Sequence, residues 1–321
     1  MTRPVVALSR RLPAAAARLL DGAADVRTPD VDRPLTAAEL RTAVAGADAL
    51  VCLLLDRVDE ALLDAAGPQL RVVATVAVGY DNVDVEACRR RGVRVTNTPG
   101  VLTDATADLT LALLLGITRR VGEGERLLRA GTPWRWDLDF LLGTGLRGQQ
   151  LGLVGFGAIG RAVAARAAAF GMSITYSARH DAPADVTGPL GARRLPLPEL
   201  LASSDVVSLH CPLTPETHHL VDAAALRAMP SSAHLVNTAR GPVVDEAALV
   251  DALDHGEIRG AALDVFEEEP AVHPGLLARD DVLLTPHLGS ATEQTREAMA
   301  VLAARNVLAV LAGQDPPTPV V

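Results

Sequence analysis

The sequence contains no lysine, so all 30 of its basic residues are arginine. This absence excludes enzymes that form a Schiff base on a lysine, and it excludes nucleotide hydrolases that depend on a lysine-bearing phosphate loop. Aromatic residues make up only 2% of the chain. Alanine, valine and leucine must therefore fill most of its interior.

Positive charge and cysteine are also scarce. The net charge of -9 argues against a nucleic acid or an anionic membrane as partner, because both require a positive surface. The three cysteines, Cys52, Cys88 and Cys211, are too far apart in sequence for a typical metal-ligand set or disulfide framework. No segment reaches the roughly 18 apolar residues of a membrane span. We therefore expect a cytoplasmic protein without a metal site.

The length and the order of apolar segments predict two α/β domains. A chain of 321 residues exceeds what one hydrophobic core usually organises. Short apolar runs alternate with stretches rich in alanine and leucine, which is typical of βα units and parallel sheets. We expect strands at residues 5–8, 49–55, 71–76, 93–96, 151–154, 173–176, 206–210, 233–237, 260–265 and 282–285.

Two apolar helices mark the domain limits. One is expected at residues 103–120, where it separates the two halves of the chain, and the other at residues 291–312, where it returns to the first domain. The first domain is then discontinuous. We expect residues 1–98 and 291–321 to form a substrate (catalytic) domain, and residues 99–290 to form a dinucleotide-binding domain.

The segment LGLVGFGAIGRAVAARAAAFG predicts a dinucleotide site. It places an apolar strand, then Gly155, Gly157 and Gly160 in G-x-G-x-x-G spacing around Ala158 and Ile159, and then a helix. The glycines permit a tight turn, close approach of a pyrophosphate and close helix packing, and the helix N-terminus attracts the anion. A plain glycine turn is the alternative, which the flanking strand and helix make less favourable.

The next strand indicates which cofactor is preferred. Its end carries Ser177, Ala178 and Arg179 where an enzyme specific for NAD has an acidic residue. A hydroxyl and a guanidinium suit a 2′-phosphate, so we expect NADP to be preferred, with NAD as the alternative. Asp181 lies beyond the expected strand end, and its position in the loop could reverse this preference.

Three residues after strand ends suit the reduction of a 2-oxo acid. Such a reaction needs a cation for the carboxylate, a proton donor for the carbonyl oxygen and a partner that keeps the donor protonated. Arg240, His287 and Glu269 fit these roles in that order, and an unperturbed histidine has a pKa of about 6.5. Taken singly, each has a plain alternative: a surface ion pair, a structural hydrogen bond, or a solvated run of glutamates.

Several motifs occur in one order along nearly the whole chain. They are VGYDNVD, TNTPGVLTDATADLTLALLL, PWRW, LGLVGFGAIG, HCPLTPET, NTARGPVVDEAALVDAL, GAALDVFEEEP and LLTPHLGSAT. At these motifs the chain resembles the D-isomer-specific 2-hydroxyacid dehydrogenases, and within them the glyoxylate and hydroxypyruvate reductases. The resemblance implies doubly wound parallel sheets, with a Rossmann-type cofactor domain inserted in a flavodoxin-like substrate domain.

The resemblance also implies roles for single residues. It assigns the catalytic roles to Arg240, Glu269 and His287, and it implies that the backbone amides of Val78 and Gly79 bind the substrate carboxylate. Further positions are implied to contact the cofactor, with Asp264 and Ser290 near the nicotinamide. These are Cys211, Pro212, Thr217, Thr238, Ala239, Asp264 and Ser290.

A homodimer is the implied assembly. The resemblance implies an interface formed largely by the helix at residues 103–120, although a helix buried within one domain would have the same apolar character. It also implies a tryptophan that reaches the neighbouring subunit's pocket. Trp134 or Trp136 matches that position, and a packing role is an equal alternative for either.

Departures from the family pattern leave the substrate open. Leu55 stands where the reductases commonly have threonine, and Ala158 replaces a frequent arginine. Glu269 counts against a formate dehydrogenase, which has glutamine there. The alternatives are an NAD-linked 3-phosphoglycerate or phosphite dehydrogenase, for which Arg57 is the nearest extra cation in sequence, and a cofactor-sensing transcriptional corepressor.

Overall fold

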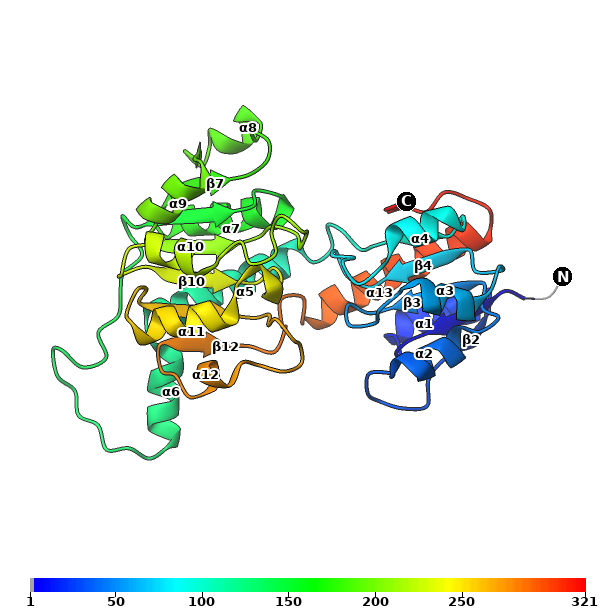
Figure 1. Cartoon of the computed structure of the whole chain (residues 1–321), viewed down its shortest axis with the longest axis horizontal. Coiled ribbons are helices and arrows are strands. Elements are labelled where there is room, and N and C mark those ends of the chain that lie inside the picture. Colours follow the sequence, from blue (N-terminus) through cyan, green and yellow to red (C-terminus); the bar gives the residue numbers. More distant parts are fainter. Residues whose placement is uncertain (1–2) are drawn as a thin grey trace. The chain divides into compact units, whose positions relative to one another are not determined.

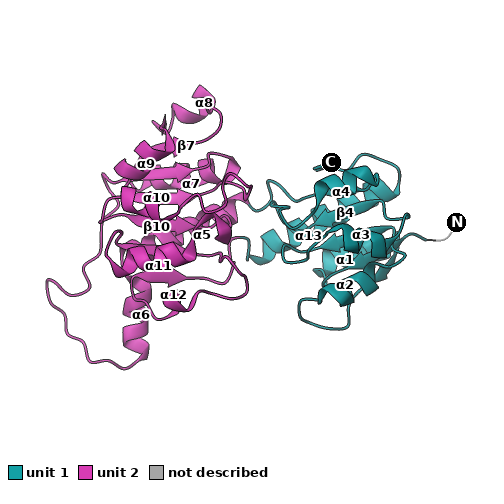
Figure 2. Cartoon of the chain, viewed as in Figure 1, with its two compact units in different colours: residues 1–102, 290–321 teal, residues 103–289 magenta. Residues whose placement is uncertain are grey.

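The computed structural model describes residues 3–321 and divides into two compact units (Figures 1 and 2). Unit 1 consists of residues 1–102 and 290–321, and unit 2 of residues 103–289. Each unit is built around one parallel sheet, as the alternation of apolar runs and helical stretches predicts. The two-sheet α/β class expected from the sequence is confirmed.

Unit 1 contains a five-stranded parallel sheet with the order β2-β1-β3-β4-β5. This is the flavodoxin-like order. The central strands are short and apolar because helices cover both faces of the sheet. The strands are β1 (Val5–Leu8), β2 (Asp25–Arg27), β3 (Ala49–Cys52), β4 (Val72–Thr75) and β5 (Arg94–Thr96).

Right-handed crossovers determine on which face of the sheet each helix of unit 1 lies. The step from β1 to β2 runs opposite to the later steps, so its helix α1 lies on the other face from α2, α3 and α4. Helix α13 packs beside α1 and against β4. The helices are α1 (Ala14–Asp21), α2 (Ala37–Val44), α3 (Glu60–Ala66), α4 (Val85–Arg90) and α13 (Glu293–Leu311).

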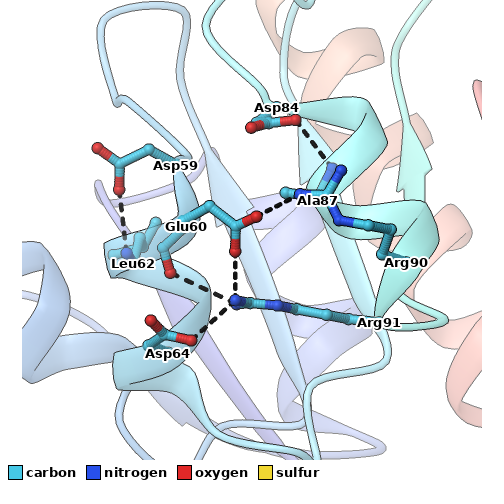
Figure 3. A network of polar contacts seen from close by, with 8 residues as sticks. All are labelled: Asp59, Glu60, Leu62, Asp64, Asp84, Ala87, Arg90 and Arg91. Carbon is cyan, nitrogen blue, oxygen red and sulfur yellow. Dashed lines mark hydrogen bonds and ion pairs between the residues drawn. The ribbon is translucent and has the colours of Figure 1, made fainter.

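Side-chain caps and a polar network fix α3 and α4 (Figure 3). Asp59 accepts a hydrogen bond from the amide of Leu62 and begins α3, and Asp84 caps α4 in the same way. Glu60 on α3 forms ion pairs with Arg90 and Arg91 at the end of α4. These exposed pairs hold the two helices in register more than they add stability.

Unit 2 contains a seven-stranded parallel sheet with the order β12-β11-β10-β9-β6-β7-β8. The chain begins at β6, runs to β8 at one edge, and returns to β9 on the other side of β6. This reversal is the Rossmann switch point. The strands are β6 (Gln150–Val154), β7 (Ser173–Ser177), β8 (Arg193–Arg194), β9 (Val206–Leu209), β10 (His234–Asn237), β11 (Gly260–Leu263) and β12 (Val282–Leu284).

Two helix layers cover this sheet. Helix α5 packs against α7 and against β10 and β11, whereas α10 packs against α9 and α11. No helix in residues 3–321 is both long enough and apolar enough to cross a membrane. The helices of unit 2 are α5 (Thr103–Thr118), α6 (Val121–Arg129), α7 (Ala158–Ala169), α8 (Ala184–Thr187), α9 (Leu197–Ser203), α10 (Ala223–Ala228), α11 (Glu246–Asp254) and α12 (Pro274–Leu277), with a 3-10 turn η1 (Gly241–Val243).

The structure corrects several element limits. It adds β2 and β8, two short exposed edge strands whose polar residues carry no apolar pattern. Five of the ten predicted strands end one to three residues earlier; β3, for example, stops at Cys52 rather than Leu55. The helix expected at residues 103–120 ends at Thr118, where Arg120 adopts a left-handed φ of 52° and α6 begins.

Candidate functional site

The loop after β6 has the geometry that a glycine motif is expected to produce. Gly155 has a φ of 96°, a left-handed value that favours glycine, and a Cβ there would lie 2.6 Å from the carbonyl of His210. A Cβ at Gly160 would lie 2.4 Å from the carbonyl oxygen of Gly155. These two glycines therefore let α7 and the loop after β9 approach the end of β6.

The middle glycine faces open space. A Cβ at Gly157 would meet no atom within 4 Å, and Gly157 and Ala158 are exposed at the N-terminus of α7. The loop lies at the ends of β6 and β9, the two strands between which the strand order reverses. An exposed helix N-terminus beside a glycine loop suits the pyrophosphate of a dinucleotide, so the residues present fit the expected cofactor.

Strand β7 pairs with β6, and its end carries three residues that are expected to contact the cofactor. Ser177 is the last residue of β7, and its carbonyl accepts a hydrogen bond from the amide of Gly155. Ala178 is partly buried, and Arg179 is exposed. Arg194 of β8 forms a 2.9 Å ion pair with Asp181. The carboxylate that made the cofactor preference ambiguous thus has a cationic partner, which the sequence pattern did not reveal.

The hydroxyl group of Thr217 holds the loop after β9 together by two hydrogen bonds. Thr217 donates a 2.6 Å hydrogen bond to the carbonyl of Pro212 and accepts one of 2.8 Å from the amide of Thr214. The neighbouring Cys211 is partly buried, and burial raises the pKa of its thiol to about 11. A protonated thiol suits a lining role better than nucleophilic chemistry.

His287 and Glu269 are in direct contact. The Nδ1 atom of His287 lies 2.8 Å from Oε2 of Glu269, and both side chains are mostly buried. The other oxygen of Glu269 accepts a hydrogen bond from the amide of Phe266, at 3.1 Å. The carboxylate is therefore anchored on one side and orients the imidazole with the other, which leaves Nε2 of His287 for a different partner.

Asp264 organises the loop that carries the histidine. Its buried carboxylate accepts hydrogen bonds from the hydroxyl of Thr285 at 2.6 Å and from the amides of Leu288 and Gly289 at 2.7 and 2.8 Å. Burial raises the pKa of Asp264, whereas these hydrogen bonds oppose the increase. This bonding holds His287 at a φ of 53°. The expected nicotinamide contact of Asp264 stays a prediction.

Arg240 lies in a tight turn after β10. The side-chain amide of Asn237 donates to the carbonyl of Arg240 at 2.9 Å, and its oxygen accepts from the amide of Ala239 at 3.0 Å. A Cβ at Gly241 would lie 1.9 Å from the carbonyl group of Phe266. Only a glycine therefore lets the loop of Arg240 pack against the loop that carries Glu269, a requirement that sequence reasoning missed.

A reciprocal carboxylate pair supports the same loops. The Glu246 carboxylate accepts a hydrogen bond from the amide of Glu267 at 2.7 Å, and the Glu267 carboxylate accepts one from the amide of Glu246 at 3.0 Å. Glu267 also contacts Nε2 of His219 at 2.6 Å. A solvated face is the plain alternative for the run of three glutamates, but at least Glu267 and Glu269 have structural partners.

Helix α5 is tied to the end of β10 by a buried pair of hydroxyls. The oxygens of Thr110 and Thr238 lie 2.9 Å apart. Thr238 is 8% exposed, and Ala239 beside it is partly buried. The hydroxyl of Thr238 therefore has a partner within the protein, while its backbone and Ala239 line the turn before Arg240.

The predicted site residues of unit 1 lie on two loops. Val78 and Gly79 follow β4 and are half-buried, and the carbonyl of Val78 accepts a 2.8 Å hydrogen bond from Asn97. Within residues 3–321, the amides of Val78 and Gly79 donate to no backbone or side-chain acceptor. These two amides can therefore bind an anion. Ser290 precedes α13, and its carbonyl accepts a hydrogen bond from the amide of Thr292.

The two tryptophans lie on an exposed segment after α6. Trp134 stacks on Phe140 with ring centroids 6.0 Å apart, whereas Trp136 is 75% exposed. Leu138 on the same segment is 80% exposed. Apolar side chains of this size exposed together are typical of a surface that contacts a partner.

Comparison with known proteins agrees with this geometry. Residues 111–289 match the family model described as D-isomer specific 2-hydroxyacid dehydrogenase, NAD binding domain. The match covers more than half of the chain. It includes the glycine loop as well as Arg240, Glu269 and His287.

Curated relatives match over nearly their whole length. The glyoxylate reductase of Thermococcus litoralis is 44% identical over 320 residues, which cover 98% of this chain and 96% of that protein. The glyoxylate reductase of Aeropyrum pernix is 47% identical over 323 residues, which cover 99% and 96%.

Solved structures share the complete fold. A protein of Thermus thermophilus has a TM-score of 0.92 at 50% identity, covering 99% of this chain and 100% of that chain. The NADPH-dependent glyoxylate/hydroxypyruvate reductase of Sinorhizobium meliloti, solved in complex with NADP and malonate, has a TM-score of 0.88 at 36% identity. That similarity covers 99% of this chain and 97% of the other.

Proposed function

The chain belongs to the D-isomer-specific 2-hydroxyacid dehydrogenase family, and on this premise we propose that it reduces glyoxylate, hydroxypyruvate or a similarly small 2-oxo acid to the 2-hydroxy acid. The observation that carries the proposal is the 2.8 Å contact between His287 and Glu269. A carboxylate on Nδ1 stabilises a protonated imidazole and aims Nε2 away from it, as a proton donor to a carbonyl oxygen requires.

Each residue has a defined task in this reaction. When bound, a nicotinamide cofactor supplies the hydride that adds to the carbonyl carbon. His287 gives its proton to the carbonyl oxygen, and Glu269 balances the charge of the imidazolium before that transfer. In the reverse direction the neutral His287 removes the hydroxyl proton. Arg240 binds the substrate carboxylate through a planar guanidinium.

Unit 1 contributes anion-binding capacity of its own. The amides of Val78 and Gly79 are half-buried and donate to no acceptor in residues 3–321, so a carboxylate would satisfy both. Arg57, the extra cation that a phosphate-bearing substrate would need, is 85% exposed and pairs with Asp59 at 3.5 Å. This pairing favours a small substrate over 3-phosphoglycerate.

We assign NADP as the preferred cofactor. The proposal is supported by Arg179, which is exposed after β7, and by the ion pair that Arg194 forms with Asp181. Paired with an arginine, Asp181 repels a 2′-phosphate less than a lone carboxylate would. Ser177 adds a hydroxyl at the strand end. The reductase of Sinorhizobium meliloti is a relative whose structure contains this cofactor.

A homodimer is the proposed assembly. The exposed segment with Trp136 and Leu138 supplies an apolar surface suited to a partner subunit. Helix α5, which the resemblance places in the interface, has a largely apolar sequence. Measurement of the molar mass in solution by light scattering tests this assembly directly.

The activity and the cofactor preference are tested together. A panel of 2-oxo acids assayed with NADPH and NADH should give the highest kcat/KM with glyoxylate or hydroxypyruvate and NADPH. If no 2-oxo acid is turned over, the proposed enzymatic activity is wrong, and a cofactor-sensing protein is favoured instead.

The cofactor preference has a matched pair of variants. Arg179→Gln should reduce the NADPH advantage by about tenfold, because one charge-assisted contact to the phosphate is lost. Arg193→Gln removes the same charge from a neighbouring exposed position and should leave the preference unchanged. Equal preferences in wild type and Arg179→Gln would refute the assignment of Arg179.

A further inference from the structure

A cavity lies within unit 2, at the end of the sheet opposite the loops that carry the candidate catalytic residues. Its volume is about 440 Å³, within the usual range for small-molecule sites. It is lined by His234 at the start of β10, by Arg259 just before β11, and by Asp281 just before β12. Arg240, Glu269 and His287 follow the other ends of strands β10, β11 and β12, so the cavity is separate from them.

The acidic residues of this cavity are paired with arginines. Each of the three carboxylates that line it has a guanidinium within ion-pair distance, and the guanidinium of Arg279 is shared with Asp254 outside the lining. The pairs are Glu123 with Arg120 at 2.6 Å, Asp280 with Arg126 at 2.8 Å, and Asp281 with Arg279 at 2.7 Å.

Arg259 is the arginine of the lining that forms no ion pair with a described residue. It is exposed, and within residues 3–321 its side chain has no carboxylate within ion-pair distance and no hydrogen-bond acceptor. The positive charge of Arg259 acts on His234, because it contributes to the lowered pKa of that imidazole. Arg259 therefore supplies, at the cavity wall, a positive charge without an ion-pair partner among the described residues, although the chain as a whole carries -9.

His234 provides a second, independent feature. It is only 4% exposed, and its ring nitrogens have no hydrogen-bond partner anywhere in the described part of the chain, yet the side chain lines the cavity. Burial, and then the charge of Arg259, lower the pKa of His234 to about 4. Near neutral pH the ring is uncharged and presents one N–H donor to the cavity. A ring nitrogen without a protein partner on the cavity wall is available to a ligand.

We propose that this cavity binds a small oxyanion of the phosphate or phosphate-monoester class, through the guanidinium of Arg259 and a ring N–H of His234. A guanidinium matches two phosphate oxygens at once, and a neutral imidazole adds a directed donor without additional charge. The remaining volume accommodates the organic part of a monoester. The site is distinct from the dinucleotide loop and does not depend on the proposed reaction.

Titration calorimetry with inorganic phosphate tests the site in the full chain. Saturating NADPH occupies the phosphate contacts of the dinucleotide loop, and sodium chloride keeps the ionic strength constant. We expect saturable binding that Arg259→Gln weakens by at least about tenfold, because a charge-assisted contact is lost. Arg227→Gln, which removes an exposed arginine of α10 outside the cavity lining, should bind phosphate as wild type does.

A second experiment, nuclear magnetic resonance of the histidine rings, identifies where the ligand binds. The imidazole resonances of His234 should shift on addition of phosphate in wild type and in Arg227→Gln, but not in Arg259→Gln. A parallel calorimetric titration uses glycerol phosphate in place of inorganic phosphate. The ligand with the lower Kd shows whether the site prefers a monoester or free phosphate. Failure of both ligands to bind saturably, or equal binding by wild type and Arg259→Gln, would overturn the proposal.

Discussion

At the scale of single residues, one hydrogen bond gives the candidate site its chemistry. Glu269 is held by the amide of Phe266 and in turn holds Nδ1 of His287. The imidazole thus has one orientation available, with its other nitrogen directed away from the carboxylate. A histidine without this partner would lose both the orientation and the stabilised positive charge.

Replacement of the carboxylate tests this pair. Glu269→Gln keeps the shape of the side chain but removes its charge, so the imidazolium loses stabilisation. We expect kcat for reduction to fall by at least about tenfold, because general acid catalysis contributes about 10²- to 10⁴-fold and the acid loses its charge partner. The Kd for NADPH should stay unchanged in a fluorescence titration. A kcat equal to that of wild type would show that the carboxylate only packs against the ring.

The substrate cation is tested by a change that keeps its charge. Arg240→Lys removes the planar fork, and the two-pronged contact to a carboxylate becomes a single point contact. We expect kcat/KM for the 2-oxo acid to fall by about tenfold to hundredfold, corresponding to one charge-assisted hydrogen bond. The Kd for NADPH, measured by fluorescence titration, should stay unchanged. An unchanged kcat/KM would contradict the proposed carboxylate contact.

At the scale of elements, the loops after parallel strands bring the candidate residues together. Asp264 follows β11, and its carboxylate bonds the loop after β12 that carries His287. Gly241 lets the loop after β10 approach Phe266. The positions after strand ends could be predicted from the sequence because strands have a readable apolar pattern. The contacts between neighbouring loops could not, because they depend on strand order.

A single methyl group should separate two of these loops. Gly241→Ala places a Cβ 1.9 Å from the backbone carbonyl of Phe266, so one loop must move. We expect kcat/KM to fall by more than about tenfold, since displacements of this order misplace catalytic groups. Gly145→Ala is the matched control, because its added Cβ meets no atom within 4 Å. Equal activities of the two variants would show that the loop contact does not position Arg240.

At the scale of the whole molecule, buried histidine links stability to pH. The pKa of His234 is lowered from 6.5 to about 4 in the folded chain. Between these pH values the unfolded chain binds a proton that the folded chain does not, so stability falls as the pH is lowered from about 6.5 towards 4. Above about 6.5 the contribution is constant.

The midpoint of thermal unfolding should reveal this link. In phosphate-free buffer it should decrease as the pH is lowered from 7.5 to 5, with His234 contributing up to about 1.4 kcal/mol per pH unit below 6.5. His234→Asn removes the titrating group and should give a shallower decrease, measured by calorimetry. His180→Asn changes an exposed histidine and should retain the wild-type slope. Burial also lowers the pKa of His210, to about 3, so a slope remains in His234→Asn. Identical slopes for all three proteins would show that His234 does not contribute to the decrease.

The sequence by itself determined the fold class, and it predicted the glycine loop and the three residue types proposed for reduction of a 2-oxo acid. Those features depend on local patterns: apolar periodicity, glycine spacing and the residues that follow strand ends. Only the tertiary structure decided that Arg194 pairs with Asp181, that Gly241 must lack a side chain, and that His234 faces a cavity beside Arg259. These contacts join residues from separate strands and loops, and their partners are set by strand order and packing, which local sequence does not encode.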